Sequence, residues 1–368
     1  MAESGFAYES CPLKHYVRVH GWLPACRRQL AAIRRQPKQR RLRYFTFCAS
    51  GAVDVLMLNV ARIIRLSDSG KFDTVVFFDK DEEAVNATYI NIPGSRGFPA
   101  DFADLVLAPD IGDVDALSSD TDKSDTSEVR QQKRLARQRN DFIQQFPFDI
   151  INLDLEEFLL KARDEFPGRI LRSFMQILQW QKRPLPTGRT IDEFVLMYTT
   201  QIGPRELTDQ YRELLDGAIA DNLRNIPALE AVLHSRTGHN GPVSLRNADF
   251  DEFFRIAAPK LLAGYLRRAD WLIDPEPGIS VFEFDRPSAR GPYKMLHFVM
   301  HVKRQHPPEI IRRPDQQGDG VPEAYSAVAH QLFAERETNV SLDNIDADGL
   351  LANLAQIFAR RRKYASGS

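Results

Sequence analysis

The stretch from residue 43 to residue 107 constrains the fold of this chain more than any other part of the sequence. Two short runs of aromatic and β-branched residues, 43–48 and 74–78, indicate buried strands, and each is followed by small or acidic residues and then by a helical pattern. A third strand is weakly marked at residues 96–98. Strands that alternate with helices in this order are typical of a parallel α/β sheet.

The rest of the chain continues this alternation. Apolar residues recur at helical spacing over residues 53–65 and 82–92, which predicts amphipathic helices that lie against the sheet. Residues 279–285 and 293–302 alternate like strands around a short loop, which predicts an antiparallel hairpin. Further helices are expected at 23–35, 128–145, 155–163, 169–180, 206–236 and 250–268, and further strands at 148–153 and 193–199.

The sequence therefore predicts an α/β fold: a Rossmann-like, mostly parallel sheet with helices on both faces and a C-terminal antiparallel hairpin. We expect this domain to span residues 43–305, after a basic N-terminal extension at 1–42 and before a C-terminal helical extension at 306–368. Residues 110–127 are rich in Asp, Ser and Thr, which indicates an acidic, solvated loop inserted into the domain. The chain of 368 residues is long enough for one large domain with additions, which we expect, or for two ordinary domains, since single cores stop growing near ~250–300 residues.

Composition excludes several classes of protein. A hydrophobic content of 43% and a charged content of 27% are typical of soluble globular proteins. No apolar run approaches the ~18 residues that span a bilayer, and the N-terminus lacks the apolar segment of a signal peptide, so we expect a cytoplasmic protein without a membrane partner. Three cysteines, an odd number, do not form a disulfide framework, and reduced thiols are expected.

Charge is distributed unevenly although the formal net charge is only −1. Residues 10–53 contain no acidic residue and many arginines, with aromatic residues between them. Because phosphates attract cations and exposed bases stack on aromatic rings, this segment is a candidate nucleic-acid surface. The alternative is a solvated helix face whose arginines pair with acids elsewhere, including those of the acidic loop. The candidate nucleic-acid residues are Arg34, Arg35, Arg40 and Arg41.

Small and polar residues follow the predicted strands at the points where ligands bind in an open parallel sheet. Small residues after the first strand would let a ligand approach the main chain, and an acid after the second strand would accept hydrogen bonds from ribose hydroxyls. The alternative is that these acids end strands and cap the following helices. The candidates are Ala49, Ser50, Gly51, Ala52, Asp79, Asp81, Asp101, Asn152 and Asp154.

With these residues in this order, the chain resembles the class I S-adenosylmethionine-dependent methyltransferase fold, over roughly residues 43–302. The resemblance implies S-adenosylmethionine as cofactor. It implies that the 49–52 loop holds the methionine part, that Asp79 or Asp81 binds the ribose and that Asp101 faces the adenine. It also implies that Asn152 and Asp154 face the methyl group and the substrate.

Two functional hypotheses follow. The first is an S-adenosylmethionine-dependent methyltransferase, with nucleic acid as the candidate substrate. The second is a catalytically silent member of that fold, a scaffold or partner-binding subunit of a larger bacterial-type assembly. The retained acids favour the first hypothesis, whereas the single glycine of the first loop, Gly51, and the lack of proline after Asn152 favour the second. Motifs typical of serine hydrolases, NTPases and zinc proteases are absent from the sequence.

Other residues of chemical interest are expected to be structural. Cys11, His15, His20 and Cys26 are of the types that bind zinc, but they lack the compact spacing of zinc sites, and no metal site is predicted. His297 and His301 fall on one face of the second hairpin strand, where we expect them to be partly exposed. Cys48 is expected to be buried as a small apolar residue.

Overall fold

The chain folds into two compact units. Unit 1 comprises Met1–Leu153, Arg169–Ile191 and Leu342–Ser368, and unit 2 comprises Asp154–Gly168 and Asp192–Ser341. Together their elements make an α/β fold with parallel strands, flanking helices and an antiparallel pair towards the C-terminus, as the sequence predicts. This computed structural model describes residues 11–36, 40–110, 127–155, 160, 166–185, 188, 190–202, 207–286, 293–305, 323–334 and 337–365.

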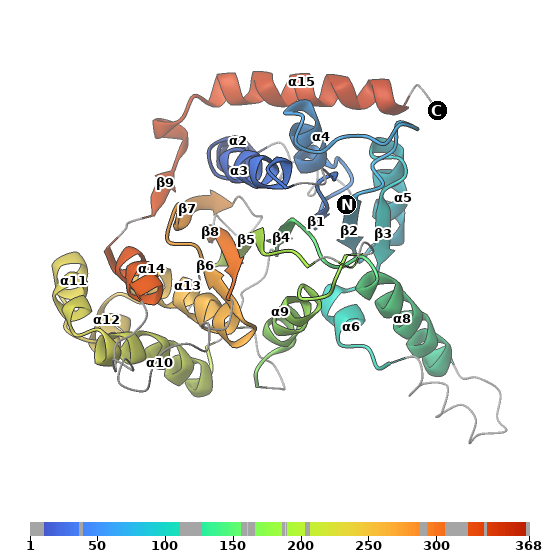
Figure 1. The fold of residues 1–368 in the computed structure, drawn as a ribbon. Coiled ribbons are helices and arrows are strands. Elements are labelled where there is room, and N and C mark those ends of the chain that lie inside the picture. The colour runs from blue at the N-terminus through green and yellow to red at the C-terminus, as the bar shows by residue number, and fades with distance from the viewer. Residues whose placement is uncertain are drawn as a thin grey trace. The chain divides into compact units, whose positions relative to one another are not determined.

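Parallel strands form the centre of unit 1 (Figure 1). They run in the order β3-β2-β1-β4, which is the order of the first half of a Rossmann sheet, and the order reverses between β1 and β4. Tyr44 of β1 pairs with Val75 of β2 on one side and with Ile150 of β4 on the other. The predicted strands are confirmed, including the weakly marked third one. Their bounds are β1 (Tyr44–Thr46), β2 (Val75–Asp79), β3 (Arg96–Pro99) and β4 (Ile150–Asp154).

Strand β1 presents a different chemistry to each face of this sheet because side chains alternate along a strand. Phe45 packs against Phe142 of α8, with ring centroids 5.2 Å apart, on the face that α6 and α9 also cover. Tyr44 and Thr46 point to the opposite face, where their hydroxyls bind Asp54 of α4. The helices that follow the strands are α4 (Val53–Val60), α5 (Glu82–Asn91), α6 (Phe102–Val106), α8 (Ser127–Ile143) and α9 (Arg169–Trp180).

Helix α4 is shorter than the 53–65 pattern predicts. It ends at Val60, and Arg62 then adopts a left-handed conformation with φ of 58°, which a helix cannot continue through. Ile63 and Ile64 are nevertheless buried, so the apolar residues that suggested a longer helix lie in the turn after α4 and still pack in the core.

Gly97 of β3 allows close packing, because a Cβ there would lie 2.5 Å from the Phe77 ring of β2.

Helices from both ends of the chain pack within unit 1. The N-terminal segment forms α2 (Pro12–Val17), a π-helical stretch (Arg18–Trp22) and α3 (Leu23–Arg34), and only the last of these was expected from the sequence. The long helix α15 (Ala347–Ala365) contacts α2, α4 and α5 (Figure 1). The two terminal segments predicted as additions therefore both contribute packing to the unit that holds β1–β4.

Antiparallel pairing dominates the sheet of unit 2. Strands β7 and β8 form the predicted hairpin, in which Ile279 pairs with Met300 and Arg286 with Tyr293. Strand β8 also pairs with β5 and β6, and β9 lies parallel to β7. The short strands β6 and β9 were not predicted. The bounds are β5 (Glu193–Gln201), β6 (Trp271–Ile273), β7 (Ile279–Arg286), β8 (Tyr293–Arg304) and β9 (Thr338–Val340).

The helices of unit 2 include α13, which has the predicted bounds although Pro259 lies inside it. Helices α10, α12 and α14 pack on α13, and α11 packs on α14.

Among the described residues, no helix has the length and apolarity needed to cross a bilayer. The predicted acidic loop at 110–127 and helix at 155–163 fall almost entirely outside the described residues. The helices are α10 (Asp209–Asn225), α11 (Ala228–Thr237), α12 (Pro242–Ala248), α13 (Phe250–Arg268) and α14 (Glu323–Ala334).

Candidate cofactor site

The loop between β1 and α4 is a tight, anchored turn. The Ala52 N–H donates to the Ala49 carbonyl at 2.8 Å, and Ala52 adopts a left-handed conformation with φ of 48° where α4 begins. Asn91 of α5 donates from Nδ2 to the Ser50 carbonyl at 2.6 Å. Gly51 and Ala52 are buried, whereas Ala49 and Ser50 are half-buried. The loop therefore has a defined backbone at the carboxyl end of β1 and carries no side chain larger than serine at residues 49–52.

Asp79 ends β2 at the same edge of the sheet. Its Oδ1 accepts a hydrogen bond from the Asp81 N–H at 2.9 Å, and its carbonyl accepts one from the Ala100 N–H at 3.1 Å. The side chain is half-buried, and burial raises the pKa of its carboxyl. Because Phe77 pairs with Thr46, the carboxyl end of β2 adjoins the loop that follows β1.

Asp81 and Asp101 both cap helices. Asp81 accepts from the Glu83 N–H at 2.9 Å at the start of α5, and Asp101 accepts from the Asp104 N–H at 3.0 Å at the start of α6. The capping alternative is confirmed for both residues. Both side chains are exposed, so the cap leaves room for contact with a ligand, and their role in cofactor binding stays a prediction.

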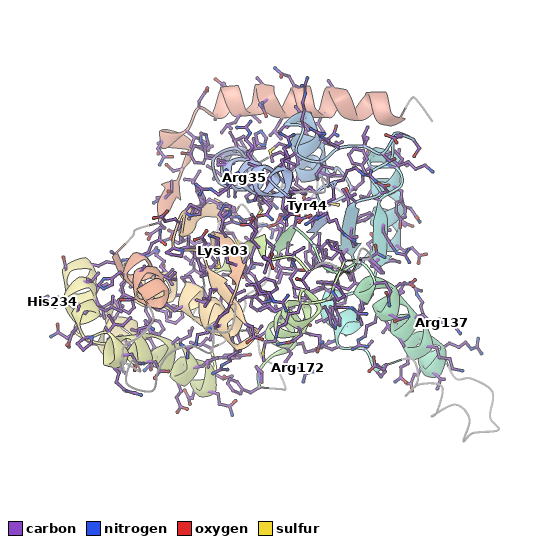
Figure 2. All side chains as sticks on the ribbon, viewed as in Figure 1. Arg35, Tyr44, Arg137, Arg172, His234 and Lys303 are labelled. Atoms are coloured by element: carbon purple, nitrogen blue, oxygen red, sulfur yellow. The ribbon has the colours of Figure 1, made fainter. Side chains whose placement is uncertain are left out.

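Asn152 lies inside the unit, in a polar cluster formed with Tyr44, Thr46 and Asp54. Asp54 accepts hydrogen bonds from the Tyr44 hydroxyl at 2.8 Å and from the Thr46 hydroxyl at 2.7 Å. Asn152 Nδ2 donates to the same two hydroxyl oxygens at 3.1 and 3.2 Å, and its side chain is 0% exposed. Burial raises the pKa of Tyr44 well above its usual value. Figure 2 shows Tyr44 among the packed side chains of unit 1.

Asp154 is the other residue of the predicted catalytic pair. It is the last residue of β4 and is half-buried, two positions beyond the buried Asn152. The helix that it was expected to cap lies outside the described residues. Of the predicted pair, Asp154 is thus the residue whose side chain is partly accessible.

The candidate nucleic-acid arginines divide into two groups. Arg34 and Arg35 are exposed at the end of α3, and Figure 2 marks Arg35. Arg40 makes two hydrogen bonds of 2.5 Å to the buried carboxylate of Asp149. Arg41 binds Asp73 in the same two-pronged way, at 2.5 and 2.7 Å. The alternative of arginines paired with acids therefore holds for Arg40 and Arg41, although their partners are not in the acidic loop.

The expected exposure of two histidines was wrong. His297 is 1% exposed and His301 is 9% exposed, and Nδ1 of His297 lies 2.7 Å from the Thr199 hydroxyl of the paired strand β5. Strand β8 is covered on both faces, so its alternating pattern did not distinguish an inner face from an outer one. Cys48, expected to be buried, is 3% exposed.

The residues with zinc-ligand types do not gather. Cys11 and Cys26 are buried with free thiols, and His15 donates from Nε2 to Asn353 Oδ1 of α15 at 2.9 Å. In the described part of the chain, no three His, Cys, Asp or Glu side chains are placed to hold a metal ion.

Sequence reasoning missed two residues that support this edge of unit 1. Asp54 is the acid of the polar cluster, and its signal was an acidic residue within the apolar run of α4. Asn91 fixes the loop after β1 from α5, and no local pattern marks it, because the contact joins residues 41 positions apart.

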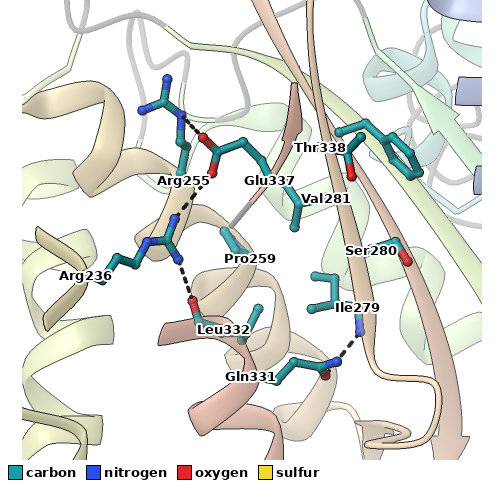
Figure 3. A pocket seen from close by; sticks show the side chains of 11 residues that line it. Arg236, Arg255, Pro259, Ile279, Ser280, Val281, Gln331, Leu332, Glu337 and Thr338 are labelled. Atoms are coloured by element: carbon teal, nitrogen blue, oxygen red, sulfur yellow. Dashed lines mark hydrogen bonds and ion pairs between the residues drawn. The ribbon is translucent and has the colours of Figure 1, made fainter. Parts of the chain in front are cut away.

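Unit 2 contains a small cavity of about 160 Å³ beside β7 and β9 (Figure 3). Arg236 and Arg255 line it, and both bind Glu337 at 3.4 Å. Arg236 also binds Glu252 at 2.5 Å, and Arg255 binds Glu283 at 2.7 Å. Each arginine there binds at least two glutamates, so this network joins α11, α13 and β7 to the segment before β9 and leaves neither arginine unpaired for an anionic ligand.

No protein-family model matches the chain, and no curated protein matches its sequence. The α/β fold and the arrangement of residues at the carboxyl edge of β1–β4 are therefore the observations on which a function can be argued.

Proposed function

We propose that the protein is an S-adenosylmethionine-dependent methyltransferase that acts on nucleic acid, with its cofactor at the carboxyl edge of β1, β2 and β3. One observation carries the proposal: the anchored loop of small residues after β1 and the half-buried Asp79 after β2 lie on adjacent parallel strands. They adjoin the reversal of strand order between β1 and β4, where open α/β sheets bind their ligands.

The roles of the cofactor residues follow from their chemistry. The turn at residues 49–52 offers main-chain groups to the methionine part of the cofactor without a bulky side chain in the way. Asp79 has one carboxylate oxygen bound to the Asp81 N–H, and its carboxylate can accept hydrogen bonds from the two ribose hydroxyls. Asp101 follows β3, the next strand outward, which suits contact with the adenine.

Methyl transfer needs little machinery beyond placement. The sulfonium methyl must lie in line with the nucleophile, and an amine nucleophile must lose its proton. Asp154, half-buried at the end of β4, is suited to accept that proton. Asn152 holds the ends of β1 and β4 through the hydroxyls of Tyr44 and Thr46, and so acts by positioning.

The exposed arginines support nucleic acid as the substrate class. Exposed arginines lie along α3 and directly after it, and one helix face with this charge suits phosphate contacts: Arg27, Arg28 and Arg34 on the helix, and Arg35 at its C-cap. Because Arg40 and Arg41 already bind carboxylates, the surface that we propose consists of these four arginines.

A second candidate function is a catalytically silent, partner-binding member of the same fold. The full burial of Asn152 favours it, since a buried amide cannot touch a substrate. Gly51 as the single glycine of the first loop favours it as well.

Calorimetric titration with S-adenosylmethionine tests the proposal. The full-length protein should bind the cofactor saturably at micromolar to low-millimolar concentration. Asp79→Ala should weaken binding roughly ten-fold or more, since the ribose hydroxyls would lose an acceptor worth at least ~1.4 kcal/mol. Asp68→Ala is the matched control, because Asp68 is an exposed acid in the turn before β2, and it should leave the affinity unchanged.

The outcomes separate the candidates. Cofactor binding together with methylation of a nucleic-acid substrate supports the methyltransferase. Cofactor binding without turnover on any nucleic acid supports the silent member. No binding at millimolar cofactor, or equal affinity in the Asp79 and Asp68 variants, contradicts the proposed site.

A further inference from the structure

Helices α10, α13 and α14 of unit 2 line a second pocket, which is partly open to solvent and has a volume of about 390 Å³. Its size falls within the ~300–1,000 Å³ typical of small-molecule pockets. Small residues open it between two of the helices: Gly217 and Ala218 on α10, and Ala263 and Gly264 on α13. A Cβ added at Gly217 or Gly264 would meet nothing within 4 Å, so space continues up to the backbone of both helices.

The lining of this cavity combines apolar and polar groups. Val328, Ala329 and Leu332 of α14 and Leu272 of β6 supply apolar surface. Lys260 of α13 and Asn222 of α10 supply polar groups, and the Lys260 ammonium donates to Asn222 Oδ1. An elongated molecule with an apolar body and a polar end fits a lining of this kind.

Lys260 is an unusual residue to find at this depth. Its side chain is 5% exposed, and its Nζ lies 4.0 Å from the centre of the Phe333 ring. Among the described residues, no carboxylate lies within ion-pair distance of it, whereas the other deeply buried cations nearby, Arg236 and Arg255, each bind glutamates. Burial lowers the pKa of the Lys260 amine well below its usual value.

A buried amine without a carboxylate is costly to retain, because its charge lacks an opposite charge and Asn222 accepts from only one of its three donors. The other charged residues around the cavity are exposed and balance each other: Glu213 and Asp221 on α10, Arg267 and Arg268 on α13. Lys260 is therefore the charged group of the interior wall. Its remaining donors, with the Nδ2 group of Asn222, are placed to bind one anionic group.

We propose that this cavity binds a small amphiphilic anion, whose carboxylate or phosphate pairs with Lys260 and Asn222 and whose apolar body lies along α14 between α10 and α13. All the lining residues belong to unit 2. The proposal is therefore independent of the cofactor site, and either can fail without the other.

Four ligands with the same eight-carbon chain test the charge requirement in the full-length protein: octanoate, octyl phosphate, octanol and octylammonium. In calorimetric titrations near neutral pH, at least one of the two anions should bind about ten-fold or more tightly than octanol. Octylammonium should bind more weakly than octanol. Equal affinity of the anions and octanol, or no binding of either anion at millimolar concentration, would overturn the proposal.

Two variants test whether Lys260 causes the preference for anions and whether the ligands occupy this cavity. Lys260→Met keeps the length and apolar stem, so it should raise the melting temperature while reducing the preference for the anions over octanol to about one-fold. Gly217→Leu fills the cavity from α10 and should abolish binding of all four ligands. Lys303→Met is the matched control, because it removes a surface lysine of unit 2 that pairs with Asp274 at 2.8 Å. An unchanged anion preference in Lys260→Met, or its loss in Lys303→Met, would contradict the assignment.

Discussion

Arg40 has a structural role in the basic N-terminal segment, whereas Arg34 and Arg35 of the same segment are exposed. Asp149 is 1% exposed, and its carboxylate is held by Arg40 and by the Arg43 N–H at 2.8 Å. Arg40→Ala should therefore lower the free energy of unfolding by about 2–3 kcal/mol, towards the low end for a broken buried pair because Arg40 is itself 21% exposed. Urea denaturation measures this loss.

The matched control is the double variant Arg34→Ala/Arg35→Ala, which removes two exposed arginines at the end of α3. Its free energy of unfolding should stay within about 0.5 kcal/mol of the original value. Its affinity for nucleic acid should fall, and with it the steepness of the salt dependence. If the double variant unfolds as readily as Arg40→Ala, or binds nucleic acid with unchanged affinity and salt dependence, this division of the arginines is wrong.

Asp54 is the acceptor of the polar cluster at the end of β1. Asp54→Ala leaves the Tyr44 and Thr46 hydroxyls without their charged acceptor, so the free energy of unfolding should fall by about 2–4 kcal/mol. Asp54→Asn keeps an acceptor oxygen and should lose roughly half as much. Asp68→Ala, at an exposed site, should cost less than about 0.5 kcal/mol. Thermal or urea unfolding of the three variants measures these losses. An unchanged free energy of unfolding in Asp54→Ala would contradict the stabilising role of Asp54.

At the scale of elements, His15 links α2 to α15. Its pKa is lowered from 6.5 to about 4, first by burial, then by the nearby Arg18, while the hydrogen bond to Asn353 acts in the opposite direction. The unfolded chain therefore takes up a proton at this residue at a higher pH than the folded chain does. The stability tied to neutral His15 is complete above about pH 6.5 and is lost as the pH falls towards about 4.

His15→Gln removes this titration but keeps a group that can bind Asn353. Between about pH 7 and pH 4.5, the original protein should lose about 2 kcal/mol more free energy of unfolding than the variant does. Because acidic side chains titrate alike in both proteins, the difference isolates His15. Parallel loss of stability in the two proteins over this range would show that His15 does not link α15 to the N-terminal helices as a neutral residue.

Whole elements were the most predictable part of the molecule. The bounds of α9 and α13 and the pairing of the β7–β8 hairpin follow from apolar periodicity and turn residues. Short elements such as β6 and β9 were missed because three residues carry no usable period, and their positions depend on pairing with β8 and β7. The burial of His297 and His301 was missed because β8 is covered on both faces, which is a tertiary effect that the alternating pattern of the strand does not reveal.

The candidate site was predictable in position but less so in detail. The sequence correctly placed Asp79, Asp81 and Asp101 at the carboxyl ends of β2 and β3. These ends lie at one edge of the sheet because the strands are parallel. The burial of the Asn152 side chain could not be predicted from the sequence. It depends on hydrogen bonds to the hydroxyls of Thr46 and Tyr44 on β1, which lie 106 and 108 positions away. Lys260 did have a local signal, a single lysine between the apolar pairs Ala257-Ala258 and Leu261-Leu262 of α13.

The most direct test of the central claim, a cofactor site at the carboxyl edge of β1–β3, is amide hydrogen exchange with and without S-adenosylhomocysteine, the product of methyl transfer. Bound product should slow exchange at the loop of residues 49–52 and at the residues that follow Asp79 and Pro99. Unchanged exchange throughout unit 1 at saturating product, or protection confined to unit 2, would contradict the account.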